Sequence, residues 1–390
     1  MKKIFFLFVL LFVIGCKSEK KWEYGHINLK EGFKKKEFIL LSEVAEDIEY
    51  VFLETNDNGL ISDIRKVIFD PPYFFIMDSN EKSIVIFDEN GKYINTITKH
   101  GQGPQEYLGI CDFDVYNHVI YILDNNQLKI VLYDINGNFI DTFKFTEYAT
   151  SLKVLSENEI ITVTLNGLIY SNEGYVFSEY DKNFNLKRRF KSMNKNEREN
   201  CYSTISFYKQ KDTLVYWEYN VFDTVYNIFP DGSSEVRFCL DPGRIPSSLV
   251  QSTQESHKVA AGQFEIGSLI ETEDYVFIFS IYNRQFSSMI YNKNNNRTIG
   301  IENYLANDID GGGSFWPSFK INDNKVGATI FPFEMKAFLE KEIAEYHKDF
   351  NYKRYRPKLD YDVEKHKKLL EQLENTDDMS NPVLRIVTMK

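Results

Sequence analysis

The chain has 390 residues, of which 43% are hydrophobic and 15% aromatic, and its formal net charge is -11 at pH 7. So acidic a chain is excluded from the nucleic-acid-binding class, because that class needs a basic face that neutralises phosphates. Two basic runs, Lys34 to Lys36 and Lys187 to Arg189, are expected to be solvated faces rather than binding sites.

The first 15 residues have the pattern of a secretory signal peptide. Two lysines precede an uninterrupted apolar run, residues 4–14, which is too short for the roughly 20 residues of a membrane-spanning helix. Val-Ile-Gly before Cys16 resembles a lipobox, the site where signal peptidase II cuts in front of a lipidated cysteine. We therefore expect residues 1–15 to be removed and Cys16 to carry a lipid that tethers the protein to a membrane.

The segment that follows the cysteine, residues 16–40, is polar and rich in lysine. Such a composition is typical of a flexible tether. Beyond it, Phe and Tyr are frequent and Asn-Gly and similar breaks recur at short intervals, which favours many short strands.

An internal repeat lies in this β-rich region. Residues 74–97 align without a gap on residues 120–143, so the period is 46 residues. Each copy has two alternating strands, an Asn-Gly turn and a third strand, because Asn-Gly supplies the positive-φ residues of a tight hairpin. Several strands in a period of this length are the signature of a β-propeller blade.

Weaker copies extend the pattern towards the C-terminus. The segments that match Tyr133-Asp134 in these copies lie at Tyr180, Ile228 and Ile290, with an inserted stretch at about 241–267 and a sixth copy around Phe319 to Phe331. The sequence therefore predicts an all-β fold over residues 41–390, a six-bladed β-propeller with short C-terminal helices.

The glycine-rich stretch at residues 99–107, KHGQGPQEY, falls between two copies. It lacks the Lys-Ser/Thr pair and the following helix of a phosphate-binding loop, so we interpret it as the connection from one blade to the next. Gly101 and Gly103 would allow the chain to reverse without a Cβ clash.

Two further features are expected near the chain ends. Residues 48–54 and 383–389 alternate as strands do, and we expect one or both to complete the terminal blade and so close the ring. Helices are expected around Met335 to Tyr346 and Val363 to Leu373, the second capped by Asp360 or Asp362 and both packing outside the propeller or across one mouth.

The remaining cysteines are Cys111, Cys201 and Cys239. An odd number cannot all pair, and no Cys or His spacing indicates zinc. One disulfide can form in an oxidising compartment, but we expect buried thiols.

The loop at residues 307–317 is the first candidate ligand site. Asp308 and Asp310 precede a glycine as in the first part of a calcium loop, although the rest of that motif is missing. The glycines that follow could present Phe315 and Trp316 at a propeller mouth, where rings beside carboxylates suit a sugar. The alternative for Trp316 is a core anchor. We expect no bound metal or other cofactor, with calcium at this loop as the alternative.

Tyr282 and Arg284, just after an apolar strand, could also reach the mouth. No nucleophile elbow or zinc-binding His pair is present in the sequence, and the six histidines are scattered singly. Catalytic residues are therefore not assigned.

The run at residues 101–143 resembles an NHL-type repeat. With LSEVAEDIEYVFLET (41–55), NDIDGGGSFWP (307–317) and NPVLRIVTMK (381–390), the layout is similar to six-bladed β-propeller lipoproteins of Gram-negative bacteria. This resemblance implies a location in the cell envelope, at the outer membrane, and it supplies no catalytic residues.

Two functions follow as hypotheses. The first is a noncatalytic binding module, anchored by lipid, that engages a glycan or another envelope protein. The alternative is a hydrolase or lyase that acts on a carbohydrate or small molecule in the same mouth. The absence of a recognisable nucleophile and base in the sequence favours the first.

Lipidation can be tested directly. We expect cells that express the full chain to incorporate radiolabelled fatty acid into the protein, and Cys16→Ala to abolish that labelling because the acyl acceptor is lost. Label that persisted in the variant would show that Cys16 is not the site.

Overall fold

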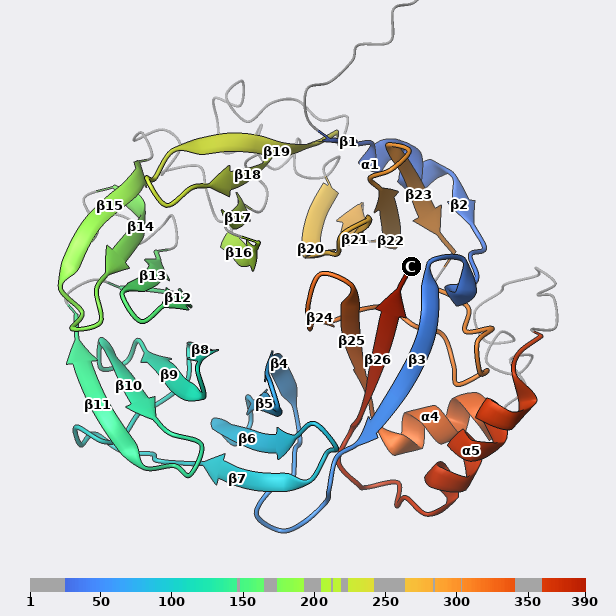
Figure 1. Cartoon of the computed structure of the whole chain (residues 1–390), viewed down its shortest axis with the longest axis horizontal. Helices are drawn as coiled ribbons and strands as arrows, with labels where there is room; N and C mark the ends of the chain where they lie inside the picture. Colours follow the sequence, from blue (N-terminus) through green and yellow to red (C-terminus); the bar gives the residue numbers. More distant parts are fainter. Residues whose placement is uncertain are drawn as a thin grey trace, which may run out of the picture.

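The structure, a computed structural model, is a closed ring of six β-sheets around a central axis (Figure 1). The expected all-β, six-bladed propeller is confirmed. The described residues are 25–145, 148–164, 174–192, 205–211, 213–218, 224–241, 264–282, 285–302, 304–340 and 360–390.

Blades 1 to 3 each contain four antiparallel strands that follow one another in chain order from the axis outward. Blade 1 consists of β4 (Ile64–Asp70), β5 (Tyr73–Asp78), β6 (Ser83–Asp88) and β7 (Tyr93–Ile97). Blade 2 consists of β8 (Asp112–Tyr116), β9 (Val119–Asp124), β10 (Lys129–Tyr133) and β11 (Phe139–Lys144). Blade 3 consists of β12 (Ser151–Ser156), β13 (Glu159–Val163), β14 (Tyr175–Tyr180) and β15 (Leu186–Ser192).

The repeated segments are the three outer strands of blades 1 and 2, as predicted. Gly91 and Gly137, in the turns before the last strands, have φ of 84° and 76°. An aspartate caps each turn: Asp88 Oδ1 accepts from two backbone N–H groups at 2.9 Å, and Asp134 does the same at 2.9 and 2.8 Å. The repeat therefore encodes the hairpin geometry as well as the strands.

Residues 98–111 connect β7 to β8, so the glycine-rich stretch is the predicted connection between blades. Gly101 N donates to Tyr107 O at 3.0 Å, and Gly103 N donates to Glu106 Oε2 at 2.8 Å. Gly101 has a φ of 155°, a backbone conformation that residues with a Cβ rarely adopt, which explains the glycine there.

Blades 4 and 5 each gain a fifth strand from the N-terminus. Blade 4 contains β16 (Ile205–Gln210), β17 (Thr213–Glu218), β18 (Thr224–Ile228) and β19 (Ser234–Leu240), and β1 (Gly25–Ile27) pairs parallel to β19. Blade 5 contains β20 (Phe264–Glu271), β21 (Tyr275–Tyr282), β22 (Gln285–Asn292) and β23 (Arg297–Ile301), and β2 (Lys36–Glu37) pairs parallel to β23.

These pairings correct two expected boundaries. The tether predicted over residues 16–40 gives way to ordered structure from Gly25 on, with α1 (Leu29–Lys34) between the two added strands. Strands of two or three residues show no alternation in sequence, so the pattern could not predict them. Likewise β20 begins at Phe264, inside the predicted insertion of 241–267; residues 242–263 lie outside the described part.

Blade 6 closes the ring with both chain ends. It contains β24 (Phe319–Lys320), β25 (Lys325–Ile330), β26 (Val383–Met389) and β3 (Ala45–Phe52), and β26 pairs antiparallel with both β25 and β3. A short 3₁₀ helix, η1 (Leu41–Glu43), precedes β3. The prediction that one or both terminal strands complete the last blade is confirmed, and both do.

Six apolar clusters lie between successive blades. Strand β5 shows how they form: Phe75 and Met77 face the cluster shared with blade 2, and Phe74 and Ile76 face the cluster shared with blade 6. Successive side chains of a strand point to opposite faces, so each blade is covered only by its two neighbours.

The two C-terminal helices pack outside blade 6 (Figure 1). They are α4 (Pro332–Glu340) and α5 (Val363–Glu374), and Asp362 is the N-cap of α5, with bonds from two backbone N–H groups. Met335, Leu369 and Leu373 pack on Val383 of β26. The predicted helical positions Ile343 and Tyr346 lie outside the described residues. No helix among those described is long and apolar enough to span a membrane.

Cys111 and Cys239 form no disulfide with each other and are half-buried. Burial raises the pKa of the Cys111 thiol. Cys201 lies outside the described residues.

Closure by β26 can be tested with a matched pair of substitutions. Leu384 is fully buried and Leu186 is 42% exposed. We expect Leu384→Ala to lower the free energy of unfolding by about 2–5 kcal/mol and Leu186→Ala by less than about 1 kcal/mol, measured by urea denaturation. Equal losses in the two variants would contradict a closing role for β26.

Candidate functional site

The loop predicted to bind a ligand, residues 307–317, joins blade 5 to blade 6 and is fixed between β3 and the start of α5. Asp310 is 2% exposed, and its Oδ1 accepts from Asn307 Nδ2 at 2.7 Å and from Tyr50 OH at 3.0 Å. The N–H of Gly312 donates to the same oxygen at 2.9 Å. Asp308 accepts from Ser42 N at 2.9 Å. Both carboxylates therefore hold the loop to blade 6.

The partners of Asp310 are themselves held in one protonation state or position. Burial, and next the charge of Asp310, raise the pKa of Tyr50, so this hydroxyl keeps its proton and donates. His366 Nδ1 lies 2.7 Å from the backbone oxygen of Asp310, which fixes the loop to α5. This loop is a structural joint.

Phe315 is fully buried in the cluster between blades 5 and 6. The expectation that the glycines present it at a mouth is wrong, because the ring fills that core and lies 5.5 Å from the Arg385 guanidinium. Trp316 is half-buried, edge-on to Phe277 at 5.6 Å and stacked with Tyr304 at 6.1 Å. Trp316 therefore fits neither alternative alone: its ring packs against the core cluster, as a core anchor would, but it is only partly buried.

Tyr282 lies apart from this loop. It is half-buried at the end of β21 and packs edge-on against Phe33 of α1, with ring centroids 4.9 Å apart. It borders the cluster between blades 4 and 5, whereas the 307–317 loop borders the cluster between blades 5 and 6. Arg284 lies outside the described residues. The structure does not bring the predicted ligand-binding residues together.

For calcium, both carboxylate oxygens of Asp308 and Oδ1 of Asp310 already accept hydrogen bonds from protein donors. Within the described ranges, no group of three or more His, Cys, Asp or Glu side chains could hold a metal ion.

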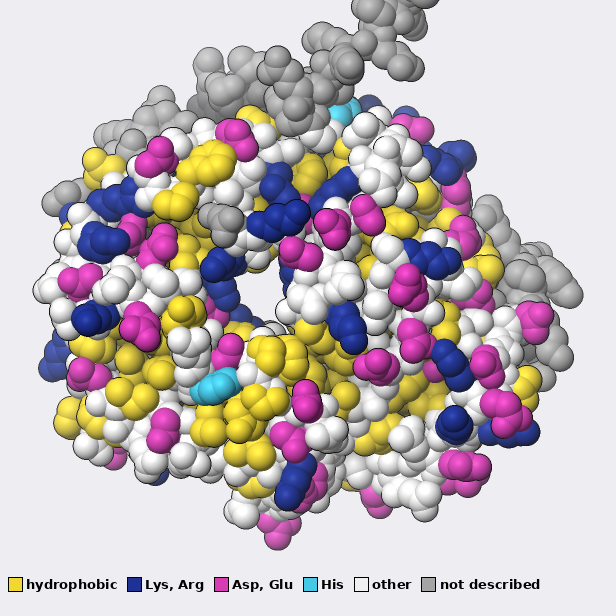
Figure 2. Space-filling view, viewed as in Figure 1, with side chains coloured by type: hydrophobic (Ala, Val, Ile, Leu, Met, Phe, Trp, Pro, Cys, Tyr) yellow, Lys and Arg dark blue, Asp and Glu magenta, His cyan; other side chains and the backbone are white. Residues whose placement is uncertain are grey.

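The central channel gathers charged side chains that the sequence patterns did not indicate. Figure 2 shows an opening through the ring with Lys and Arg side chains along its rim on the side of β16 and β20. The innermost strands β4, β8, β12, β16, β20 and β24 line it. Of the side chains that the structure describes on these strands, two are exposed, those of Arg65 and Lys209.

Arg65 sits at an irregularity in β4. The pairing of β4 with β5 shifts register between Ile64 and Lys66, so Arg65 is an extra residue on its strand. A bulge of this kind turns a side chain away from the regular alternation. Because neighbouring blades cover both faces of every blade, an exposed side chain on an inner strand faces the channel or its mouth.

Glu271, the last residue of β20, is fully buried in a cluster of donors that joins blades 4 and 5. Its Oε2 accepts from Tyr208 OH at 2.6 Å and Arg237 Nε at 2.8 Å. Its Oε1 accepts from Arg237 Nη2 and Lys293 Nζ, both at 2.5 Å. All of these contacts run between blades 4 and 5 or within blade 5.

The electrostatics of this cluster keep Glu271 ionised. Burial acts to raise the pKa of Glu271, but the hydrogen bond and charge of Arg237 and the charge of Lys293 outweigh it and lower the pKa below 4.5. Burial and the Glu271 charge raise the pKa of Tyr208 well above its ordinary value. The pair is thus a fixed carboxylate and a fixed donor.

A second charged cluster joins blades 1, 2 and 3. Asp112 pairs with Lys66 at 2.8 Å, and Asp114 pairs with Lys153 at 2.7 Å. Asp114 is fully buried and also accepts from the backbone N–H of Val154 at 2.7 Å. Asp112 and Asp114 are therefore occupied by partners in the two neighbouring blades.

The predicted solvated run at Lys187 to Arg189 needs a partial correction. Lys187 and Arg188 both pair with Glu179, whose side chain is 3% exposed. Strand β14 brings this buried carboxylate opposite Arg188, a cross-strand pairing that the basic run alone could not show.

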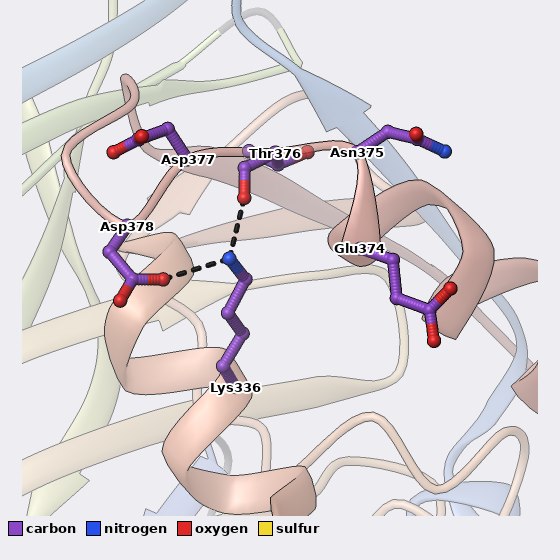
Figure 3. Close-up of a pocket in the computed structure, with 6 residues that line it drawn as sticks. All are labelled: Lys336, Glu374, Asn375, Thr376, Asp377 and Asp378. Carbon is purple, nitrogen blue, oxygen red and sulfur yellow. Dashed lines mark hydrogen bonds and ion pairs between the residues drawn. The ribbon is translucent and has the colours of Figure 1, made fainter.

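A depression of about 510 Å³ lies between α4 and the turn after α5 (Figure 3). Lys336 points into it and donates to Thr376 O at 2.5 Å and to Asp378 Oδ1 at 2.8 Å. These bonds tie the two helices together. The depression is open and polar, and Lys336 already donates its hydrogen bonds to Thr376 and Asp378, so we do not assign it as a ligand site.

Comparisons with known proteins agree with this fold. The family model described as "Domain of unknown function (DUF4934)" matches residues 25–388. A protein of Bacteroides fragilis NCTC 9343 described as exported is similar in structure, with a TM-score of 0.70 and 17% identity over 94% of this chain and 99% of that chain. A member of the DUF4221 family from Bacteroides vulgatus ATCC 8482 has a TM-score of 0.44 and 12% identity over 66% and 84%. No curated protein matches.

The Glu271 cluster generates a stability prediction. Glu271→Gln should lower the free energy of unfolding at neutral pH by about 3–5 kcal/mol, because Arg237 and Lys293 lose their buried counter-charge. The matched control is Glu273→Gln, whose side chain is 65% exposed and 3.9 Å from Lys211; it should cost less than about 1 kcal/mol. Chemical denaturation of both variants measures the difference.

The same pair has a defined pH dependence. A carboxylate whose pKa falls on folding contributes stability above its unfolded pKa, near 4.5, and that contribution is lost as the pH drops through the folded pKa. The difference between the parent and Glu271→Gln should therefore shrink in acid. A difference that grew on acidification would contradict an ionised Glu271.

Proposed function

We propose, given that this chain belongs to the DUF4934 family, that it is a lipid-anchored binding module of the bacterial cell envelope, located at the outer membrane, whose central channel holds an anionic ligand. The predicted signal peptide and Cys16 support the anchor, and the similar Bacteroides fragilis protein is described as exported. The family description names no ligand, so the ligand class is inferred from the side chains of the channel.

The observation that carries the proposal is the character of the exposed inner-strand side chains. Both Arg65 and Lys209 are cations, and neither forms a salt bridge within the described ranges. By contrast, three described carboxylates on the same strands are paired: Asp112 and Asp114 with lysines, and Glu271 with Arg237 and Lys293. A chain with an overall negative charge thus leaves positive charge available in its channel.

The described channel favours binding over catalysis. A general base must be able to take up a proton near neutral pH, but Glu271 is saturated by donors and its pKa is lowered. Asp114 is likewise buried against Lys153 and a backbone N–H. Both carboxylates hold blades together, so neither can serve as the general base that the alternative, a hydrolase or lyase, would need.

The ligand class follows from the charges. An acidic glycan, or an acidic segment of another envelope protein, carries the carboxylates that Arg65 and Lys209 would pair with. An arginine offers a planar fork that matches a carboxylate, and a lysine adds a compact charge. We expect affinity to fall as salt is added, because exposed charges are screened.

The test is binding of the mature protein to arrays of acidic glycans, neutral glycans and acidic peptides. We expect binding to acidic members only, and the double variant Arg65→Ala, Lys209→Ala should bind at least about tenfold more weakly. The matched control is Lys182→Ala, Lys367→Ala, which removes two exposed cations on other surfaces and should bind as the parent does.

Mass spectrometry of the recovered ligand separates binding from turnover. An unchanged ligand supports a binding module, whereas a product that depends on the protein would overturn the noncatalytic assignment. Equal binding by the parent and the double variant would move the site away from the channel.

A further inference from the structure

A basic surface lies on the outer rim of the ring where the N-terminal segment joins blades 4 and 5. It is formed by α1 and β2, residues 29–37, and we call it the N-terminal rim. The exposed cations on it are Lys30, Lys34, Lys35 and Lys36, while Leu29 and Gly32 face the blades. Figure 2 shows Lys and Arg side chains gathered over α1 and β2.

The acidic groups of the N-terminal rim do not cancel this charge. Glu37 pairs with both Lys35, at 3.2 Å, and Arg297 of β23, at 2.7 Å. Lys30 and Lys34 have no salt bridge within the described ranges, and the four lysines of residues 29–37 outnumber the two glutamates, Glu31 and Glu37. The N-terminal rim is therefore positive although the chain as a whole is negative.

The chain connectivity places this rim next to the membrane anchor. Strand β1 begins at Gly25, and Cys16 precedes it by nine residues, so the linker reaches about 30 Å at most. The linker sequence adds Lys17, Lys20 and Lys21 against two glutamates. A lipid at Cys16 would therefore keep the start of β1, beside the N-terminal rim, within about 30 Å of the bilayer.

We propose that the N-terminal rim is a membrane-facing surface that binds anionic lipid headgroups beside the anchor. The proposal rests on the proposed function only for the lipid at Cys16. A lipid anchor and a basic patch act together, because each lysine near an anionic surface adds electrostatic attraction to the hydrophobic insertion. The partner chemistry is therefore a bilayer rich in negatively charged headgroups.

One structural consequence is a fixed orientation. The N-terminal rim points outward in the plane of the ring (Figure 1), so binding through it stands the propeller on edge. The channel axis then runs parallel to the membrane, and both mouths open sideways.

The test uses the mature chain with Cys16→Ser, so that no acyl chain contributes to binding. It is mixed with phosphatidylcholine vesicles that contain or lack phosphatidylglycerol, and bound protein is measured by sedimentation. We expect binding to the anionic vesicles alone and its loss as salt is raised. The variant Lys30→Gln, Lys34→Gln, Lys35→Gln should bind at least about tenfold more weakly.

The matched control, Lys182→Gln, Lys367→Gln, Lys368→Gln, changes the same charge on exposed lysines elsewhere and should bind as the parent does. Circular dichroism and the melting temperature confirm that both variants fold, and the salt dependence of the parent needs no variant. Equal binding to both vesicle types, or equal losses in both variants, would overturn the proposal.

The outcome is separable from the proposed function. Fatty-acid labelling tests whether Cys16 carries the anchor, and ligand arrays test whether the channel binds a ligand. Vesicle binding by the unlipidated chain tests only whether the N-terminal rim binds anionic lipid. A labelled protein whose unlipidated form ignores anionic vesicles would retain the proposed function and lose this inference.

Discussion

The structure depends on one constraint: every blade has two apolar faces and can cover neither by itself. Alternate residues of β5 supply two different interblade clusters, and the same division holds around the ring. An open row of blades would leave an apolar face exposed at each end, so the ring must close. Strand β26, held between β25 and β3, makes that closure, and it joins residues more than 300 positions apart in sequence. Because a contact between such distant residues costs loop-closure entropy, it must be well packed, which fits the burial of Val383, Leu384 and Val387.

Closure also decides what the channel contains. The inner strands have their faces covered by neighbouring blades, and their polar side chains meet across blade boundaries. Asp112 and Asp114 bond the adjacent strand β12, and Glu271 bonds Arg237 of the preceding blade. A carboxylate used in this way links two blades, and its negative charge is already compensated by hydrogen-bond donors of the protein. Only charges without such a partner remain available to a ligand. For this reason the exposed cations of the inner strands, and not the carboxylates on the same strands, define the candidate site.

The sequence predicted the parts of the fold that local rules determine. The 46-residue period, the Asn-Gly turns, the capping of α5 and both closing strands follow from spacing, positive φ and alternation, and all are present. The candidate site was predicted poorly, because acidity near glycines in the 307–317 loop looks the same whether the carboxylates face a ligand or Tyr50 and Ser42. Arg65 could not be recognised, since a one-residue shift in pairing leaves no mark on the sequence. Glu271 could not be recognised either, because its partners come from strands far away in the chain.

The N-terminal segment is a feature that the sequence did not predict and that bears on how the channel could be reached. Residues 25–37 lack a strand pattern, yet β1 and β2 extend blades 4 and 5 by parallel pairing, so the proposed tether would join the ring at its rim rather than at one mouth. A tether that emerged at a mouth would direct that mouth towards the bilayer and restrict access to the channel. Attachment at the rim keeps both mouths in solvent, and a basic α1 surface would make this orientation the one of lowest free energy on an anionic membrane. In the proposed arrangement, the position of two short strands would therefore determine whether a ligand in the envelope could reach Arg65 and Lys209.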